Sequence, residues 1–282
     1  MTAGCCSMPV YEVKKMPTIG FIGAGNMAEA IARGLLRSAM VQPRDIRASD
    51  PNAERQRLFN DELGIACAGD CAVTAAASDI VVLAVKPYVM GEALAEIKPH
   101  AKVGALFISI AAGISCKFIE AALGGTARVI RVMPNTPMLA GRGMSALARG
   151  THATDQDMSD AERIFAAAGR TVRVEESMMD AVTAVSGSGP AYVFYLAEAL
   201  AAAGAKAGLD AGQAALLARE TIIGAAMLLE QSKDAPAELR RKVTTPGGTT
   251  QAAIEAMQGK GFEQMMVDAI AAAAKRSKEM GK

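Results

Sequence analysis

The 282-residue chain contains no tryptophan, and aromatic residues make up only 4% of it. Single-stranded nucleic acids are bound largely by stacking bases on aromatic rings, and duplexes by an excess of Lys and Arg. Here 30 basic residues stand against 29 acidic ones, for a net charge of +1. We therefore expect no nucleic-acid partner.

Metal ligands are also scarce. Only two histidines occur, His100 and His152, and neither has a second His or a Cys at the spacing of a zinc site. The five cysteines are an odd number without a secretory context, which is typical of a reducing compartment rather than of a disulfide framework. We expect no metal site and a cytoplasmic protein.

Long apolar runs are missing as well. No stretch reaches 18 uninterrupted apolar residues, so the sequence predicts no membrane contact. Residues 1–15 lack the apolar core of a signal peptide, and we interpret them as a disordered tail. What is present is a composition of 51% hydrophobic and 21% charged residues, which excludes a disordered chain. The length predicts about two domains at roughly 150 residues each.

Residues 16–176 alternate short β-like runs with helical stretches. The run Thr18–Ile22 precedes a helix over Asn26–Ser38, and Ile80–Val85 reads IVVLAV without any polar alternation. Such an unbroken run is typical of a strand buried on both faces of a parallel sheet. Further strands are expected over residues 45–49, 105–110, 128–133 and 171–174, with a helix over 53–63. The pattern predicts an α/β fold, an N-terminal Rossmann-like, doubly wound sheet that forms a dinucleotide-binding domain.

Residues 177–282 contain no strand-like run. Helical stretches rich in Ala, Leu and Met are expected over residues 178–204, 211–231, 237–243, 249–258 and 262–280. The helix Pro190–Ala203 is apolar on nearly every face, with Glu198 as its only charge. About 100 residues of helix offer little interior in which to bury it. We expect a C-terminal all-helical domain that forms a homodimer.

The first strand leads directly into a glycine-rich turn. Gly23, Gly25 and Ala28 form the pattern G-x-G-x-x-A between that strand and the first helix. Small residues at these positions permit a tight turn and allow backbone N–H groups to approach a pyrophosphate at the helix N-terminus. In its strand–turn–helix context the pattern predicts a dinucleotide site; a glycine-rich turn without a ligand is the alternative.

The choice between NADP and NAD depends on the end of the second strand. Asp50 is suited to accept hydrogen bonds from the ribose hydroxyls of NAD, whereas Ser49 with Arg47 and Arg55 is suited to the extra phosphate of NADP. The local sequence leaves both cofactors open.

Other segments of interest follow the carboxyl ends of predicted strands. Lys86 and Pro87 follow the buried strand, where open α/β sheets bind ligands, so Lys86 is expected either to contact the cofactor or to lie solvated at a helix start. The segments 110–113 and 131–137 end two further strands, and their small residues leave room for a nicotinamide ring.

Two segments of the helical half are unusual. Ser186–Pro190 opens a helix, with Pro190 suited to the first turn. Residues 244–250 read TTPGGTT, which places four threonines and two glycines before another helix. Thr249 or Thr250 would serve as an ordinary cap, but one residue is enough for that task. The glycines would also form a backbone-amide cradle for a carboxylate.

With these motifs, the chain resembles the Δ1-pyrroline-5-carboxylate reductases, the enzymes that make proline. The resemblance covers about residues 17–280 and is carried by residues 19–28, 84–87, 131–137, 186–192 and, most specifically, 236–254. It implies an N-terminal Rossmann domain and a helical domain that forms dimers, which assemble further, up to decamers. It also implies NADPH-dependent reduction of the C=N bond of 1-pyrroline-5-carboxylate to L-proline, with NADH as the alternative cofactor.

The resemblance assigns roles to particular positions. Cofactor contacts are implied for Gly23, Gly25, Asn26, Met27, Ser49, Val85, Lys86, Pro87 and Ala112. A place in or beside the substrate site is implied for Glu176, Thr245, Gly248, Thr249 and Thr250. Thr250 corresponds to the hydroxyl near the ring nitrogen and is the predicted catalytic residue, orienting that nitrogen and relaying a proton. The N–H groups of Gly248 and Thr249 are expected to bind the substrate carboxylate.

The chain also departs from the family pattern. Cys71 and Lys242 stand where related sequences often carry Asn, which weakens those two contacts. Two other functions remain as alternatives. The β-hydroxyacid dehydrogenases need a catalytic Lys on an interior helix, and Pro190–Ala203 contains none. A non-catalytic NADPH-binding sensor is the other, because a fold alone does not determine function.

Overall fold

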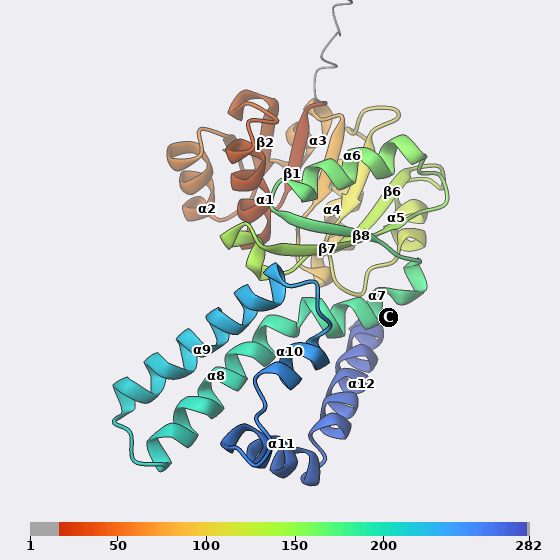
Figure 1. Ribbon diagram of the computed structural model, residues 1–282. Coiled ribbons are helices and arrows are strands. Elements are labelled where there is room, and N and C mark those ends of the chain that lie inside the picture. Colours follow the sequence, from red (N-terminus) through yellow and green to blue (C-terminus); the bar gives the residue numbers. More distant parts are fainter. Residues whose placement is uncertain (1–16, 281–282) are drawn as a thin grey trace, which may run out of the picture.

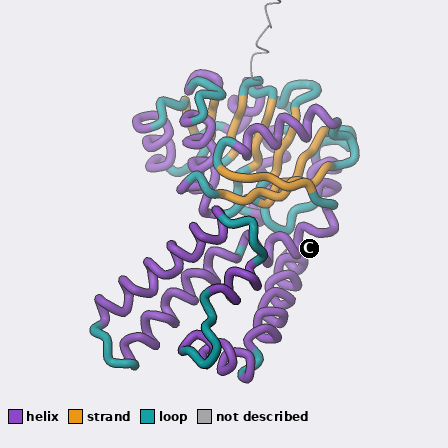
Figure 2. The backbone as a smooth tube through the Cα atoms, viewed as in Figure 1, coloured by secondary structure: helices purple, strands orange, loops and turns teal. Residues whose placement is uncertain are grey.

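The computed structural model describes residues 17–280; the expected disordered tail over residues 1–15 lies outside them. Figure 1 shows two parts, a sheet flanked by helices and, beneath it, a set of helices. The chain enters the sheet at the end remote from these helices, so the carboxyl end of β1 faces them (Figure 1). In Figure 2, strands occur only in the upper part.

The upper part contains one eight-stranded sheet, and the predicted doubly wound, Rossmann-like fold is confirmed. The strands are β1 (Ile19–Ile22), β2 (Ile46–Ser49), β3 (Ala66–Ala68), β4 (Ile80–Leu83), β5 (Leu106–Ser109), β6 (Arg128–Met133), β7 (Gly143–Arg149) and β8 (Gly169–Arg173). Their order is β3-β2-β1-β4-β5-β6-β7-β8. All neighbours are parallel except β6 and β7, which are antiparallel. The prediction missed β3, which has three residues, and β7, which is rich in small residues.

Helices cover both faces of the sheet. One face packs against α1 (Asn26–Arg37), α2 (Ala53–Arg57) with its π-helical extension Leu58–Glu62, and α6 (Asp155–Ala166). The other face packs against α3 (Cys71–Ala77), α4 (Met90–Ile97) and α5 (Cys116–Ala122). Along β4, Val82 joins the first core and Val81 the second, and both are fully buried. Burial on both sides explains the absence of polar alternation in this strand.

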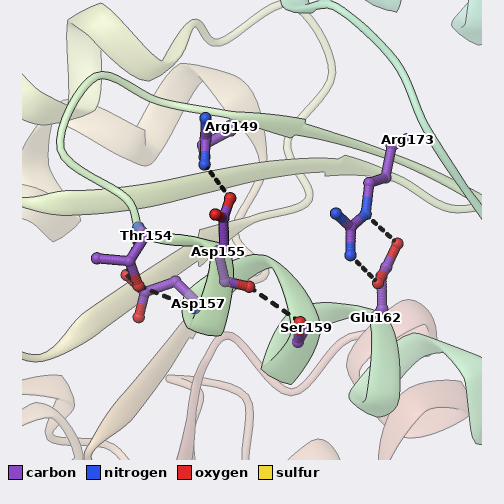
Figure 3. Close-up of polar contacts among 7 residues, drawn as sticks. All are labelled: Arg149, Thr154, Asp155, Asp157, Ser159, Glu162 and Arg173. Carbon is purple, nitrogen blue, oxygen red and sulfur yellow. Dashed lines mark hydrogen bonds and ion pairs between the residues drawn. The ribbon is translucent and has the colours of Figure 1, made fainter.

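Polar contacts tie α6 to the strands at the sheet edge. Figure 3 shows Thr154 and Asp157 facing each other at the start of α6, where they form a capping box. Nearby, an Arg149 guanidinium nitrogen lies 2.5 Å from an Asp155 carboxylate oxygen, which links β7 to α6. Arg173 at the end of β8 binds Glu162 through two nitrogen–oxygen contacts of 2.6 Å (Figure 3). These contacts attach α6 to β7 and to the edge strand β8, from which the chain continues into the helical part.

After β8 the described chain contains only helices. They are α7 (Met179–Val182), α8 (Gly189–Lys206), α9 (Ala211–Gln231), α10 (Pro236–Lys242), α11 (Thr249–Gly259) and α12 (Phe262–Met280). Pro190 lies in the first turn of α8, as predicted. The expected single helical stretch 178–204 is divided, because a π-helical turn, Thr183–Gly187, separates α7 from α8. Gly187 and Gly189 are poor helix formers and lie at this junction.

The apolar helix predicted to be buried is exposed in the single chain. No residue of α8 is buried, and Phe194 and Tyr195 are 64% and 73% exposed. Helix α9, which packs against α8, also exposes large apolar side chains and is long and apolar enough to cross a membrane by length and composition. Exposed apolar area on this scale is typical of an interaction surface.

Candidate functional site

The turn after β1 has the shape that a dinucleotide requires. Gly23 adopts a φ of +95°, and a Cβ atom there would lie 2.8 Å from the carbonyl oxygen of Ala84. Gly25 precedes the first turn of α1 and would have no heavy atom within 4 Å of an added Cβ. Gly23 therefore makes the turn possible, whereas Gly25 keeps open the space in front of the N-terminus of α1. These residues fit a bound pyrophosphate.

Residues at and after the end of β2 hold the turn through hydrogen bonds. The Gly23 N–H donates to the Ser49 carbonyl oxygen at 2.8 Å, and the Ala24 N–H donates to an Asp50 carboxylate oxygen at 2.8 Å. Arg55 donates from Nε to the Ala24 carbonyl oxygen at 2.6 Å and pairs with Glu29 at 2.8 Å. Burial alone would raise the pKa of Glu29, but the hydrogen bonds from Arg55 and Arg33 outweigh burial and lower it, which keeps the carboxylate charged.

These hydrogen bonds engage two residues that the sequence offered as cofactor ligands. Asp50, the candidate partner of an NAD ribose, uses one oxygen for the Ala24 N–H and the other for the Asn52 N–H. Arg55, a candidate phosphate ligand, is engaged with Ala24 and Glu29. Both residues therefore position the turn.

A cleft of about 460 Å³ begins at this turn. Of the predicted cofactor residues, Gly23, Gly25, Ser49, Val85 and Lys86 line it. The others lie around it, with Asn26 and Met27 at the start of α1, Pro87 after β4 and Ala112 after β5. Its size lies within the range typical of small-molecule sites.

Two of the residues that line the cleft, Ser49 and Cys71, are buried. Ser49 is only 2% exposed, and its hydroxyl lies 3.5 Å from the Phe21 carbonyl oxygen, so a contact with the cofactor requires the hydroxyl to rotate toward the cleft. Burial, followed by the neighbouring Glu96 carboxylate, raises the pKa of the Cys71 thiol to about 12. Cys71 is therefore a neutral thiol at pH 7.

Two other motifs meet at the same edge of the sheet. Asn135, two residues after the end of β6, donates from its amide to the Ser186 carbonyl oxygen at 3.1 Å and accepts the Met144 N–H at 2.8 Å. A Cβ added to Gly187 would lie 2.6 Å from the Met133 side chain. The segments 131–137 and 186–190 are thus packed together. Asn135 was not among the predicted site residues, although an Asn close behind a buried strand is a usable signal.

Glu176 connects the two parts of the chain. Its carboxylate accepts the Cys116 N–H, at the start of α5, at 2.7 Å and lies 3.3 Å from the Arg131 guanidinium. Burial, followed by the charge of Glu176, raises the pKa of the Cys116 thiol. In the single chain, Glu176 anchors the start of the helical part to β6 and α5.

The threonine-rich segment places no hydroxyl at the N-terminus of α11, whereas the Thr244 hydroxyl donates to the Arg240 carbonyl oxygen in the last turn of α10 at 2.7 Å. Helix α11 begins at Thr249 with Gly248 as its N-cap residue and without a side-chain cap. The alternative that Thr249 or Thr250 is simply a cap is therefore wrong. The Gly248 N–H is already donated to the Thr245 carbonyl oxygen at 2.9 Å, which contradicts the expectation that it binds the substrate carboxylate. Within the described part of the chain, the N–H groups of Thr249 and Thr250 are left without a partner in the first turn.

The cofactor cleft and the threonine-rich segment are not brought together within one chain. Figure 1 shows α11 at the end of the helical part that is remote from the sheet, where it contacts α12. Among residues 17–280, no group of three His, Cys, Asp or Glu side chains is placed to hold a metal ion.

Two family models match the chain. One describes pyrroline-5-carboxylate reductase dimerisation and matches residues 176–280. The other describes an NADP oxidoreductase, coenzyme F420-dependent, and matches residues 18–113. The first covers the exposed helices α8 and α9, and the second covers the glycine-rich turn and the cleft.

Similar proteins cover nearly the whole chain. A pyrroline-5-carboxylate reductase from Pseudomonas aeruginosa is 44% identical over 94% of this chain and 97% of its own. One from Escherichia coli is 36% identical over 94% and 98%. A solved structure of a pyrroline-5-carboxylate reductase from Coxiella burnetii has a TM-score of 0.89, with 34% identity over 95% of this chain and 99% of its own. Another, from Plasmodium falciparum with NADP bound, has a TM-score of 0.84 and 29% identity over the same shares. The chain therefore belongs to the pyrroline-5-carboxylate reductase family.

Proposed function

We propose that the protein reduces the C=N bond of 1-pyrroline-5-carboxylate to give L-proline, with NADPH as hydride donor. The observation that carries this proposal is the likeness to enzymes of that name over 94% of the chain. The open space at Gly25 and the cleft beside it support the use of a dinucleotide.

Different residues around the cleft bind different parts of the cofactor. Gly23 and Gly25 shape the turn, and the N–H groups of Asn26 and Met27, in the first turn of α1, face the pyrophosphate. Lys86 is exposed at the cleft and would supply a cation for phosphate or ribose. Val85 lines the cleft and Ala112 follows β5, and the family resemblance assigns both to cofactor contacts at the nicotinamide end. When bound, the reduced nicotinamide supplies the hydride. The protein contributes orientation and electrostatics.

The substrate is bound by the segment before α11. The outward N–H groups of Thr249 and Thr250 bind its carboxylate at the positive end of the helix, and Thr245 and Gly248 shape the turn beneath them. The Thr250 hydroxyl orients the ring nitrogen and relays a proton to it as the amine forms. A cyclic imine can also arrive protonated, so no stronger acid is required.

The site is completed by a second copy of the chain. Because Thr250 and the cofactor cleft lie apart in one chain, a partner must bring its own segment 245–250 to the cleft (Figure 1). The exposed apolar residues of α8 and α9 are the surface on which a homodimer forms. We propose further assembly of dimers, up to a decamer, in the cytoplasm.

The direct test is oxidation of NADPH followed at 340 nm with 1-pyrroline-5-carboxylate as the varied substrate. We expect turnover that depends on the imine and a higher kcat/KM with NADPH than with NADH. Turnover of a β-hydroxyacid instead would indicate the other dehydrogenase class. Cofactor binding without turnover would indicate a sensor.

A complementation experiment tests the shared site. Gly25→Val removes cofactor binding and Thr250→Val removes the hydroxyl, so each homodimer is expected to be impaired. If sites are shared between chains, a mixed dimer has one intact site, and random mixing restores up to about a quarter of wild-type activity. If each chain contains a whole site, mixing restores nothing, which would refute the shared arrangement.

A further inference from the structure

Tyr88 lies at the rim of the cofactor cleft and is 85% exposed. The chain has only four Tyr and seven Phe, and Tyr88 is exposed beside a cleft rather than on the apolar face of α8 and α9. Its backbone is held in place, because Pro87 begins a 3₁₀ turn over Pro87–Val89 and the Val89 N–H donates to the Lys86 carbonyl oxygen at 3.1 Å. A ring on a fixed backbone is suited to bind a flat partner with little loss of conformational entropy.

The position of Tyr88 indicates which half of the cofactor it faces. The cleft is lined by residues after β1, β2 and β3 and by the segment from β4 into α4, and none of its described lining residues comes from β5 or β6. In a sheet of this order, the adenosine half of a dinucleotide lies on the side of β1 and β2, and the nicotinamide half lies across the switch point. Tyr88 follows β4, which neighbours β1, but it lines the same cleft as Ser49, Asp50 and Pro51 at the end of β2, and this shared lining assigns it to the adenosine half.

The wall beside Tyr88 carries hydrogen-bond acceptors. Glu92 and Glu96 are one turn apart on α4, and both line the cleft together with Pro51 and Tyr88. A carboxylate accepts hydrogen bonds, and the exocyclic amine of adenine donates them. An aromatic ring, a proline and two acceptors in the lining of one cleft match the chemistry of an adenine base.

We propose that Tyr88 stacks on the adenine ring of the cofactor and that this contact supplies much of the affinity for the adenosine half. The inference rests on the proposed NADPH site and adds a binding residue to it. Stacking of a base on an aromatic side chain corresponds to roughly a 5- to 100-fold change in affinity. Because the adenine lies far from the reacting carbon, the effect falls on binding of the cofactor and not on the hydride-transfer step.

The test uses the full chain and adenosine 2′,5′-bisphosphate, which contains the adenosine half without the nicotinamide. Calorimetric titration compares the wild type with Tyr88→Ala, Tyr88→Phe and the control Phe118→Ala, which removes a surface aromatic residue that does not line the cleft. We expect Tyr88→Ala to raise Kd about 5- to 100-fold, and Tyr88→Phe and Phe118→Ala to stay within about twofold of the wild type. In kinetics, Tyr88→Ala should raise the KM for NADPH with kcat unchanged at saturation.

Fluorescence gives an independent readout, because the chain has no Trp to mask tyrosine emission. Adenosine 2′,5′-bisphosphate should quench the emission of the wild type but not that of Tyr88→Phe. A Tyr88→Ala variant that binds as tightly as the wild type would overturn the stacking contact alone. Failure of the wild type to bind either this bisphosphate or NADPH would overturn the proposed cofactor site and the stacking contact with it.

Discussion

The two glycines of the turn after β1 are expected to respond differently to substitution, although they look equivalent in the motif. Gly25 has φ −68° and ψ 179°, a conformation open to any residue, and an added Cβ meets no heavy atom within 4 Å. Gly25→Val should therefore cost only about 1 kcal/mol of folding stability, mainly because Val is a poorer N-cap residue than Gly. Its side chain instead occupies the space in front of α1.

The expected loss of NADPH affinity follows from the contacts that a pyrophosphate would make there. If Val displaces it from two backbone N–H groups, each charged hydrogen bond contributes roughly 1.5–3 kcal/mol. Two of them correspond to a loss of roughly 10²- to 10⁴-fold in affinity. Gly23→Ala should behave in the opposite way: φ is +95° and the new Cβ lies 2.8 Å from the Ala84 carbonyl oxygen. Such strain costs about 1–3 kcal/mol before any displacement of Ala84.

Thermal unfolding and calorimetric titration with NADPH on the same preparations separate the two effects. Gly25→Val should melt close to the wild type and bind NADPH at least 100-fold more weakly. Gly23→Ala should melt several degrees lower. Gly91→Ala, another glycine with open space around it but outside the cleft, is the control and should bind NADPH normally. A folded Gly25→Val variant with unchanged NADPH affinity would refute the assignment of the turn.

Three other outcomes are expected. Thr250→Val should lower kcat/KM by about 10- to 150-fold, mostly through kcat. Its Tm should be unchanged, because Thr250 is not a helix cap. Wild-type kinetics in this variant would assign the proton relay to another group. Leu200 is 40% exposed in the single chain and lies on the proposed dimer surface, so Leu200→Glu should sediment as a folded monomer. The control Val103→Glu changes an exposed residue outside α8 and α9 and should remain dimeric. Burial alone would raise the pKa of Asp79, but the Lys102 ammonium and the Thr18 N–H and hydroxyl outweigh it and lower this pKa to about 2. The Asp79 carboxylate therefore stabilises the fold above about pH 4 and loses this effect as the pH falls toward 2. The Tm difference between the wild type and Asp79→Asn should shrink over that range, and a difference that grows would contradict the ion pair.

Local sequence determined the elements and one half of the site. The unbroken run of β4, the periodic helix α1 and the G-x-G-x-x-A turn are properties of neighbouring residues, and the structure has each of them in place. The change to an all-helical half was equally visible, because strand-like runs end with β8. The three-residue β3 and the small-residue β7 escaped notice because pairing with neighbouring strands, and not their own composition, makes them strands.

The tertiary structure decided what depends on residues far apart in the chain. Asp50 and Arg55 appeared to be competing cofactor ligands, yet both hold the turn at Ala24, because folding brings the ends of β1 and β2 together. The link from Asn135 to Ser186 joins segments 51 residues apart. The distance between the cofactor cleft and Thr250 in one chain was also beyond the sequence, because the direction of α10 and α11 depends on packing (Figure 1). Sequence motifs therefore indicate the kind of chemistry. The packing of the folded chain determines which functional residues lie together and which must be supplied by a second copy of the chain.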